Sequence, residues 1–259
     1  MATILCYHSI DPDWLSPLSV PTEIFAAQAS WLARQQRLVP LERAVEIAGR
    51  SGRLPGSATA LTFDDGYAGT HRNAVPILRR LGLPATMFVV SGSLDGTVRP
   101  AEWVERADLG DRDVEVVDVE GLRELADAGW SFGSHSHRHL DLTELSEEEC
   151  RRDLATSREA LEDLLHRPVP WLAYPRGRHA AHVRRAAARA GYTHAFGLPE
   201  TPERPGPLAI PRVGIYRGDG VASMRAKLSR WYLPLRTGPA FPMAQRAVHG
   251  VRRMRGRAS

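Results

Sequence analysis

Residues 60–67 read ALTFDDGY, a short apolar run that ends in two adjacent carboxylates and a glycine. Neighbouring side chains of a strand point to opposite faces, but a bend at Gly66 would let Asp64 and Asp65 reach one pocket. Two buried anions repel each other unless a cation joins them or one of them takes up a proton. The alternative for this stretch, taken alone, is a helix N-cap beside a solvated aspartate.

Seven short apolar runs, including the one before Asp64, alternate along the chain with segments of helical periodicity. The predicted strands are residues 3–7, 58–63, 85–90, 130–133, 169–174, 194–197 and 209–215. The predicted helices are residues 21–37, 73–81, 122–128, 146–166 and 180–190. The alternation predicts an α/β fold with a mostly parallel sheet, whose chemistry lies at the carboxyl ends of the strands. With 259 residues and this number of units, a single-domain barrel is favoured over an open sheet.

A histidine cluster follows another of these runs, where residues 133–140 read GSHSHRHL. His135 and His139 are four residues apart, so one helical turn would bring both rings to the same side, with His137 pointing elsewhere. A lone histidine is usually a structural residue. Three histidines within five residues instead favour a metal, since imidazoles are common ligands of zinc and similar ions.

The carboxylates and the histidines together suggest a catalytic metal site. Two histidines and one carboxylate complete a three-ligand site with an open position. The second carboxylate is then free to act as a general base on a bound water molecule. We therefore assign Asp65 as a ligand with His135 and His139, and Asp64 as the base.

Two other stretches are candidates for the walls of the site. In residues 171–179, WLAYPRGRH, Pro175 and Gly177 flank Arg176 directly after a strand, and such a turn can aim a backbone N–H at a developing oxyanion. An ordinary strand-to-helix loop explains this stretch better when it is taken alone. The polar insertion at residues 91–117 is either a wall of a substrate cleft or a plain surface excursion.

These stretches together resemble the polysaccharide deacetylase family, which is carbohydrate esterase family four with the NodB-homology domain. TFDDG at residues 62–66 is similar to the first motif of that family, and HSHRH at residues 135–139 to its H-S-x-x-H second motif. YPRG at residues 174–177 is similar to the third motif, and PATMFV at residues 84–89 to the strand after the first. The resemblance covers roughly residues 1–216.

The resemblance implies a distorted (β/α)7 TIM-like barrel and metal-dependent de-N-acetylation of an amino sugar. By motif match it implies Asp64 as the base and Asp65, His135 and His139 as the ligands. Zinc is the expected metal, with cobalt or nickel as alternatives. The resemblance also places an oxyanion donor at the backbone N–H of Arg176, where the family usually has an aromatic residue. Tyr67, directly after the first motif, and Tyr174, in the third, are candidate substrate contacts.

The chain departs from the family pattern at the arginine that often pairs with the catalytic base. Ala173 stands at that position, directly before the residues of the third motif. Arg212, in the run at residues 209–215, is the candidate substitute. Its alternative role is an ion pair at the surface or at the bottom of the barrel, which would contribute little to stability.

The second departure concerns the general acid, a histidine that closes a late strand in many members of the family. No such strand follows residue 177, but a branch that acts on β-1,6-linked poly-N-acetylglucosamine has its motifs circularly permuted, with this strand first. LCYH at residues 5–8 resembles that strand, and the first and last strands of a closed barrel are neighbours. We therefore assign His8 as the general acid; a structural histidine is the alternative.

Charge divides the chain into a body at residues 1–226, the predicted catalytic barrel, and a basic tail at residues 227–259, expected to be partly helical or disordered. The tail holds eight basic residues and no acidic one, whereas the body holds 26 basic and 30 acidic residues. The segment RWYLPL at residues 230–235 is either a contact with an anionic membrane surface or part of a solvated tail. Nucleic acid is not expected as a partner, because no aromatic platform or known binding module accompanies the charge.

The compartment and the substrate follow less directly from the sequence. Cys6 and Cys150 suggest two buried thiols in a reducing compartment. No signal peptide and no run of about 18 apolar residues is present, so we expect a cytoplasmic protein, with the inner face of the membrane as a further option. The substrate would then be an N-acetylated glycan, a lipid-linked sugar or a small glycoside. The alternatives are a non-sugar amide or formamide, or a non-catalytic glycan-binding homologue, and the oligomeric state stays open.

Overall fold

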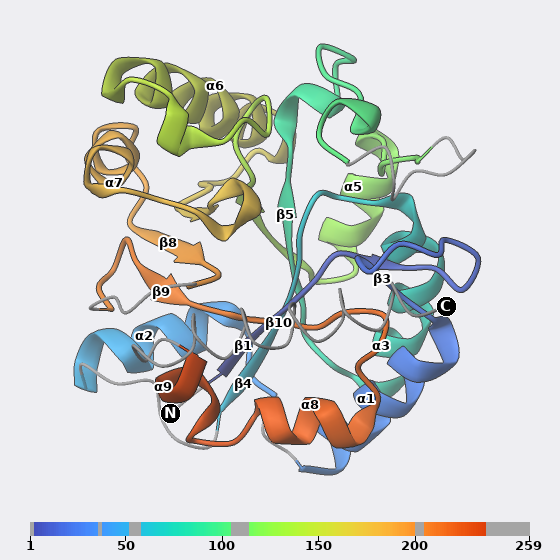
Figure 1. Cartoon of the computed structure of the whole chain (residues 1–259). Helices are drawn as coiled ribbons and strands as arrows, with labels where there is room; N and C mark the ends of the chain where they lie inside the picture. Colours follow the sequence, from blue (N-terminus) through green and yellow to red (C-terminus); the bar gives the residue numbers. More distant parts are fainter. Residues whose placement is uncertain (1–2, 36–37, 52–57, 105–113, 200–204, 237–259) are drawn as a thin grey trace, which may run out of the picture.

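The structure of the chain, a computed structural model, describes residues 3–35, 38–51, 58–104, 114–199 and 205–236. The central strands are β1 (Thr3–Tyr7), β4 (Thr59–Phe63), β5 (Thr86–Val89), β6 (Ser131–Ser134), β7 (Trp171–Ala173), β8 (His194–Gly197), β9 (Ile210–Pro211) and β10 (Val213–Gly214). They form one parallel sheet in the order β10-β1-β4-β5-β6-β7-β8-β9, which curls into a nearly closed barrel (Figure 1). All seven predicted strands are therefore present.

The barrel closes at a single extended segment, residues 210–214. β9 pairs with β8, β10 pairs with β1, and only Arg212 separates β9 from β10. One short segment thus occupies one position of the barrel while it joins both edges of the sheet (Figure 1). Seven strand positions result, and the predicted (β/α)7 TIM-like barrel is confirmed.

Helices surround the strands (Figure 1). They are α1 (Thr22–Gln35), α2 (Leu41–Ser51), α3 (Val75–Leu81), α5 (Val119–Asp127), α6 (Glu147–Leu165), α7 (Ala181–Arg189), α8 (Val221–Lys227) and α9 (Tyr232–Arg236). The five predicted helices are present, most with shifted ends; α2 and α8 were not predicted, and α9 lies in the tail that was expected to be partly helical or disordered. A π-helical turn, Thr70–Ala74, precedes α3, and a capping box of Ser146 and Glu149 begins α6. The short strands β2 (Ser9–Ile10) and β3 (Ser19–Val20) pair beside the barrel.

The end of the described chain continues the helical layer. The predicted boundary after residue 226 falls one residue before the end of α8, and Tyr232 and Leu233 of α9 pack against the core. The greater part of the predicted tail, residues 237–259, lies outside the described residues. Within the described ranges, no helix combines the length and the apolar character needed to cross a membrane.

Alternation along the strands separates two hydrophobic clusters and positions the polar groups. The inner cluster includes Ile4, Ala60, Phe88, Trp171, Ala173, Phe196 and Ile210. The cluster under the helices includes Leu5, Tyr7, Leu61, Phe63, Met87, Val89, Phe132 and Val213. Because side chains alternate, Cys6 and His8 follow Ile4 on the inner face, and Asp64 follows Ala60. Tyr7 pairs with Phe63 in the β1–β4 register, so His8 lies opposite Asp64.

Phe88 fills the centre of the barrel and needs a glycine beside it. Its ring lies 5.5 Å from that of Phe196 and 5.3 Å from the guanidinium carbon of Arg212. A methyl group added to Gly133 on β6 would come within 2.5 Å of Phe88 Cδ1 and 3.1 Å of the carbonyl oxygen of Trp171. Gly133 thus provides space that the packed interior requires.

We predict that Gly133→Ala lowers the free energy of unfolding by about 1–3 kcal/mol, the usual effect of overpacking a core. The control is Gly218→Ala, because a methyl group at Gly218 meets no atom of the described residues within 4 Å. Urea unfolding of both variants measures the difference. Equal unfolding midpoints for Gly133→Ala and Gly218→Ala would show that Phe88 is not packed as described.

Candidate active site

The first motif turns immediately after β4 and directs both carboxylates into one site. Asp64 continues the inward alternation of the strand, and Asp65 and Gly66 both have a left-handed backbone, with φ of 69° and 70°. The bend thus begins one residue earlier than the glycine at which the sequence analysis placed it. A non-glycine residue rarely adopts this conformation, so its surroundings must stabilise it. The side chains of Asp64 and Asp65 are almost completely buried.

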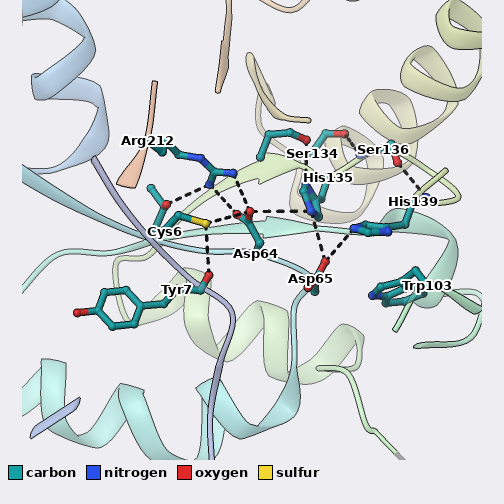
Figure 2. A network of polar contacts seen from close by, with 12 residues as sticks. Cys6, Tyr7, Asp64, Asp65, Trp103, Ser134, His135, Ser136, His139 and Arg212 are labelled. Atoms are coloured by element: carbon teal, nitrogen blue, oxygen red, sulfur yellow. Dashed lines mark hydrogen bonds and ion pairs between the residues drawn. The ribbon is translucent and has the colours of Figure 1, made fainter. Parts of the chain in front are cut away.

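Asp64 is held by a bidentate ion pair inside the barrel (Figure 2). Arg212 Nη1 donates to Oδ1 and Nη2 to Oδ2, both at 2.7 Å, and the arginine is fully buried. The thiol of Cys6 also donates to Oδ2, at 3.3 Å. Burial opposes ionisation of Asp64, but the Arg212 guanidinium outweighs it and holds the pKa of the carboxyl below its usual value. The alternative role of Arg212, a weak pair at the surface or the barrel bottom, is therefore wrong.

Asp65 faces both predicted imidazole ligands. Its Oδ1 lies 3.3 Å from Nε2 of His135 and 3.2 Å from Nε2 of His139, and all three side chains are buried (Figure 2). This oxygen accepts no hydrogen bond among the described residues. Nδ1 of His135 lies 2.8 Å from the carbonyl oxygen of Ala173, so a proton on Nδ1 leaves the Nε2 lone pair directed at Asp65. One carboxylate oxygen between two ring nitrogens fits the ligand set of a divalent cation.

Asp65, His135 and His139 also shift the pKa values of one another. Burial opposes ionisation of Asp65, but the two histidines outweigh it and bring the pKa of this carboxyl well below its usual value. Burial likewise opposes protonation of His135, and the charges of Asp64 and Asp65 outweigh it, so the pKa of His135 is raised. For His139 burial prevails and lowers the pKa. The site therefore concentrates negative charge where a cation would bind.

The histidine loop is not helical, and the predicted helical turn between His135 and His139 is wrong. Ser136 and His139 have left-handed φ values of 67° and 54°. The hydroxyl of Ser134 accepts a hydrogen bond from Ser136 N, and the hydroxyl of Ser136 accepts one from His139 N. The two imidazoles nevertheless meet, with ring centroids 4.9 Å apart. Hydroxyl–backbone hydrogen bonds bring them together in place of helical spacing.

His137 points away from this site, as expected. Its Nδ1 lies 3.0 Å from Ser91 Oγ, and its backbone N–H donates to the carboxylate of Asp153. Asp153 also accepts a hydrogen bond from Arg138 Nε, so this buried residue of α6 anchors the loop from below. Asp153 was not among the residues predicted from the sequence. A charged residue beside Cys150 and Leu154, on the apolar side of the predicted helix, was the available signal.

The carboxylates and imidazoles open into a cavity of about 270 Å³. Of the other predicted residues, His8, Tyr67 and Arg176 line it. It is also lined by residues that the sequence analysis did not assign: Leu18, Trp103, Val104, Gly177, Leu198 and Tyr216. Trp103 and Val104 come from the polar insertion, whose described part is therefore a wall of the cavity. The Trp103 ring lies 5.5 Å from that of His139 (Figure 2), and its Nε1 donates to Tyr67 Oη.

His8 lies at the side of the cavity next to Asp64. Its ring centroid is 6.4 Å from that of Tyr216, and its Nδ1 is buried without a hydrogen-bond partner among the described residues. Burial lowers the pKa of His8, although Asp65 and Asp64 oppose this shift. The ring therefore offers an unpaired nitrogen close to the carboxylates.

The third motif brings Arg176 and Gly177 to the cavity and keeps its tyrosine away from it. Arg176 and Gly177 have left-handed φ values of 57° and 69°, and a methyl group at Gly177 would lie 2.6 Å from the backbone nitrogen of Leu198. Both residues of this tight turn, Arg176 and Gly177, line the cavity. Tyr174 is fully buried, its hydroxyl donates to the carbonyl of Leu208, and it does not line the cavity. The predicted substrate contact of Tyr174 is therefore withdrawn.

Comparisons with known proteins identify the same family. Residues 51–195 match the family model described as polysaccharide deacetylase. The protein named "Putative polysaccharide deacetylase YxkH" of Bacillus subtilis (strain 168) is 28% identical over 191 residues, 73% of this chain and 61% of its own length. The poly-β-1,6-N-acetyl-D-glucosamine N-deacetylase of Staphylococcus aureus (strain MSSA476) is 23% identical over 206 residues, 75% of this chain and 67% of its own length. This chain thus spans less than two thirds of the B. subtilis protein.

Solved structures support the fold. The Streptococcus pyogenes deacetylase PplD, in complex with acetate, superposes with a TM-score of 0.73 at 22% identity, covering 88% of this chain and 98% of that one. IcaB from Ammonifex degensii superposes with a TM-score of 0.72 at 24% identity, covering 88% of this chain and 96% of that one. Since the family model matches more than half of the 259 residues, this chain belongs to the polysaccharide deacetylase family.

Proposed function

We propose that this protein is a metal-dependent de-N-acetylase that hydrolyses the acetamide of an N-acetylated amino sugar. The observation that carries the proposal is the position of Asp65 Oδ1 between Nε2 of His135 and Nε2 of His139, with the second carboxylate, Asp64, in the same cavity. Three ligands beside a second carboxylate that could act as base are the components of a hydrolytic metal site. Family membership and the activity named for the S. aureus relative support the same reaction.

Asp65, His135 and His139 would hold the metal. One carboxylate and two imidazoles suit zinc, and cobalt or nickel would fit the same donors. When bound, such a cation supplies Lewis-acid polarisation of the acetamide carbonyl and lowers the pKa of a water molecule. The carbonyl oxygen of Ala173, 2.8 Å from Nδ1 of His135, orients that ring and selects the nitrogen that remains free.

Asp64 would accept the proton of the attacking water. Its Oδ2 lies 3.9 Å from Nε2 of His135, so the base is adjacent to the ligand set without belonging to it. The ion pair with Arg212 keeps Asp64 ionised and fixes the direction of both carboxylate oxygens. Arg212 is therefore a positioning residue for the base.

His8 would donate a proton to the departing amine, and the backbone N–H of Arg176 would hold the oxyanion. The position of His8 in the cavity and its unpaired Nδ1 support this role. The Arg176 turn adjoins the same cavity, where a fixed N–H dipole stabilises developing charge. Tyr67 and Trp103 would form the wall against which the sugar ring lies.

The ligand set predicts which histidine variants lose metal. His135→Ala should bind zinc far more weakly, because one of three ligands is removed. The matched control is His137→Ala from the same loop, whose ring faces Ser91, and it should retain zinc. Zinc content is measured by mass spectrometry after loading with one equivalent and desalting. Zinc retention by His135→Ala, or zinc loss from His137→Ala, would contradict the assigned ligands.

The acid and the base should be separable from metal binding. We expect His8→Ala and Asp64→Asn to retain zinc while acetate release from N-acetylglucosamine oligomers falls by about 10²–10⁴-fold in each. Asp64→Asn also leaves Arg212 without its anionic partner, so zinc retention doubles as the check that this variant is folded. If His8→Ala fails to retain zinc, the proposed role of His8 as general acid is wrong.

Two other functions use the same residues. The site would also suit a non-sugar amide or a formamide, and acetate or formate release from small amides, compared with N-acetylglucosamine oligomers, separates these substrates. A non-catalytic glycan-binding homologue would be expected to lack a ligand or the base. All of these groups are present in one cavity, which favours the enzyme.

We also propose that the protein is cytoplasmic and contacts an anionic membrane surface. The exposed side chains of Trp231 and Leu235 lie one helical turn apart at α9, and Arg230 and Arg236 flank them. This combination suits an anionic lipid surface, and co-sedimentation with phosphatidylserine vesicles tests the contact.

A further inference from the structure

A second group of potential metal ligands lies directly beside the first. Cys6 Sγ, a ring nitrogen of His8 and a carboxylate oxygen of Asp64 all lie within 4.8 Å of one another. Cys6 and His8 are two residues apart at the end of β1, so both side chains point into the barrel. Pairing of β1 with β4 sets them against Thr62 and Asp64. The fold itself therefore assembles a thiol, an imidazole and a carboxylate at one point.

The three groups hold ligand atoms for a cation, and Asp64 Oδ2 would bind that cation while it accepts its hydrogen bond from Arg212 Nη2 at 2.7 Å. Cys6 Sγ donates a hydrogen bond to Asp64 Oδ2 at 3.3 Å. A metal ion that replaced the thiol proton would bind both the sulfur and this oxygen. The Nδ1 atom of His8 is buried and accepts nothing among the described residues. Cys6 is fully buried. Thiolate, imidazole and carboxylate are all zinc ligands, and the thiolate adds a preference for soft cations that the first site lacks.

We propose that Cys6, His8 and Asp64 form a second, inhibitory site for a thiophilic divalent cation such as Zn²⁺, Co²⁺ or Cd²⁺. Binding exchanges the thiol proton for the metal: the S–H bond breaks, a bond from sulfur to the metal forms, and the proton leaves to solvent. Asp64 Oδ2 lies between the two sites, 3.3 Å from Cys6 Sγ and 3.9 Å from His135 Nε2. The second cation therefore meets the repulsion of Arg212 and of the first cation, and this site fills after the first.

Occupation of the second site would remove the base and the acid together. Asp64 and His8 would both become ligands, and neither could then transfer a proton. General acid–base steps contribute about 10²–10⁴-fold each, so the doubly loaded protein should lose at least about 10²-fold in rate. This inhibition rests on the proposed function, whereas the binding site itself does not.

Cobalt titration of the full chain tests the site without an activity assay. A Co²⁺–thiolate bond gives a near-ultraviolet charge-transfer band that cobalt bound only to nitrogen and oxygen lacks. We expect no such band with the first equivalent of Co²⁺ and its growth with the second. Cys6→Ser should lose the band. Cys150→Ser should keep the band. Cys150, the other buried thiol, lies on α6 and donates a hydrogen bond to the carbonyl oxygen of Leu142.

The rate with excess zinc provides the second readout. Acetate release by the wild type and by Cys150→Ser should fall beyond one equivalent of Zn²⁺, whereas Cys6→Ser should keep the rate that it shows at one equivalent. Absence of the cobalt band in the wild type, or an equal band in Cys6→Ser, would overturn the second site. A band in a protein that releases acetate from no substrate would support the site and count against the proposed function alone.

Discussion

The bidentate ion pair between Arg212 and Asp64 connects the closure of the barrel to its chemistry. Arg212 stands between β9 and β10, in the segment that joins the two edges of the sheet, and Asp64 follows β4 on the other side of β1. Both residues are buried, so each compensates for the desolvation of the other. Removing one partner of such a pair typically costs about 3–5 kcal/mol, because an unpaired charge stays in the interior. Loss of either partner would therefore destabilise the fold, and the intact pair fixes the direction of the Asp64 carboxylate.

The division of charge between the two carboxylates follows from this pair. Asp64 has a permanent cation in Arg212, whereas Asp65 faces only two imidazoles through an oxygen that accepts no hydrogen bond among the described residues. The two neighbouring carboxylates thus have different partners. Asp64 is paired with a full positive charge, and Asp65 is not. This asymmetry is consistent with the proposed roles, in which Asp64 is the base and Asp65 is a metal ligand.

Most of the barrel could be predicted from the sequence. Strands appear as apolar runs, and the motifs follow directly after them, so both can be recognised from neighbouring residues alone. Alternation along the strands also places Cys6, His8 and Asp64 on the inner face. The histidine loop was predicted wrongly, because its left-handed backbone depends on the hydroxyls of Ser134 and Ser136, which spacing does not reveal. Tyr174 shows the same limit, since the direction of a side chain after a strand depends on the neighbouring strand. Trp103 reaches the cavity through long-range packing of an insertion that carries no periodic pattern.

A crystal structure of the protein loaded with one equivalent of zinc, with an anomalous difference map at the zinc edge, tests the central claim most directly. The ligand set proposed here predicts a single strong peak within bonding distance of Asp65 Oδ1 and of Nε2 of His135 and His139. Asp64 should stay paired with Arg212 and not bind that zinc ion. A peak bound by Asp64 in place of Asp65, or a fully loaded protein with no peak in this cavity, would contradict the division of roles between the two aspartates.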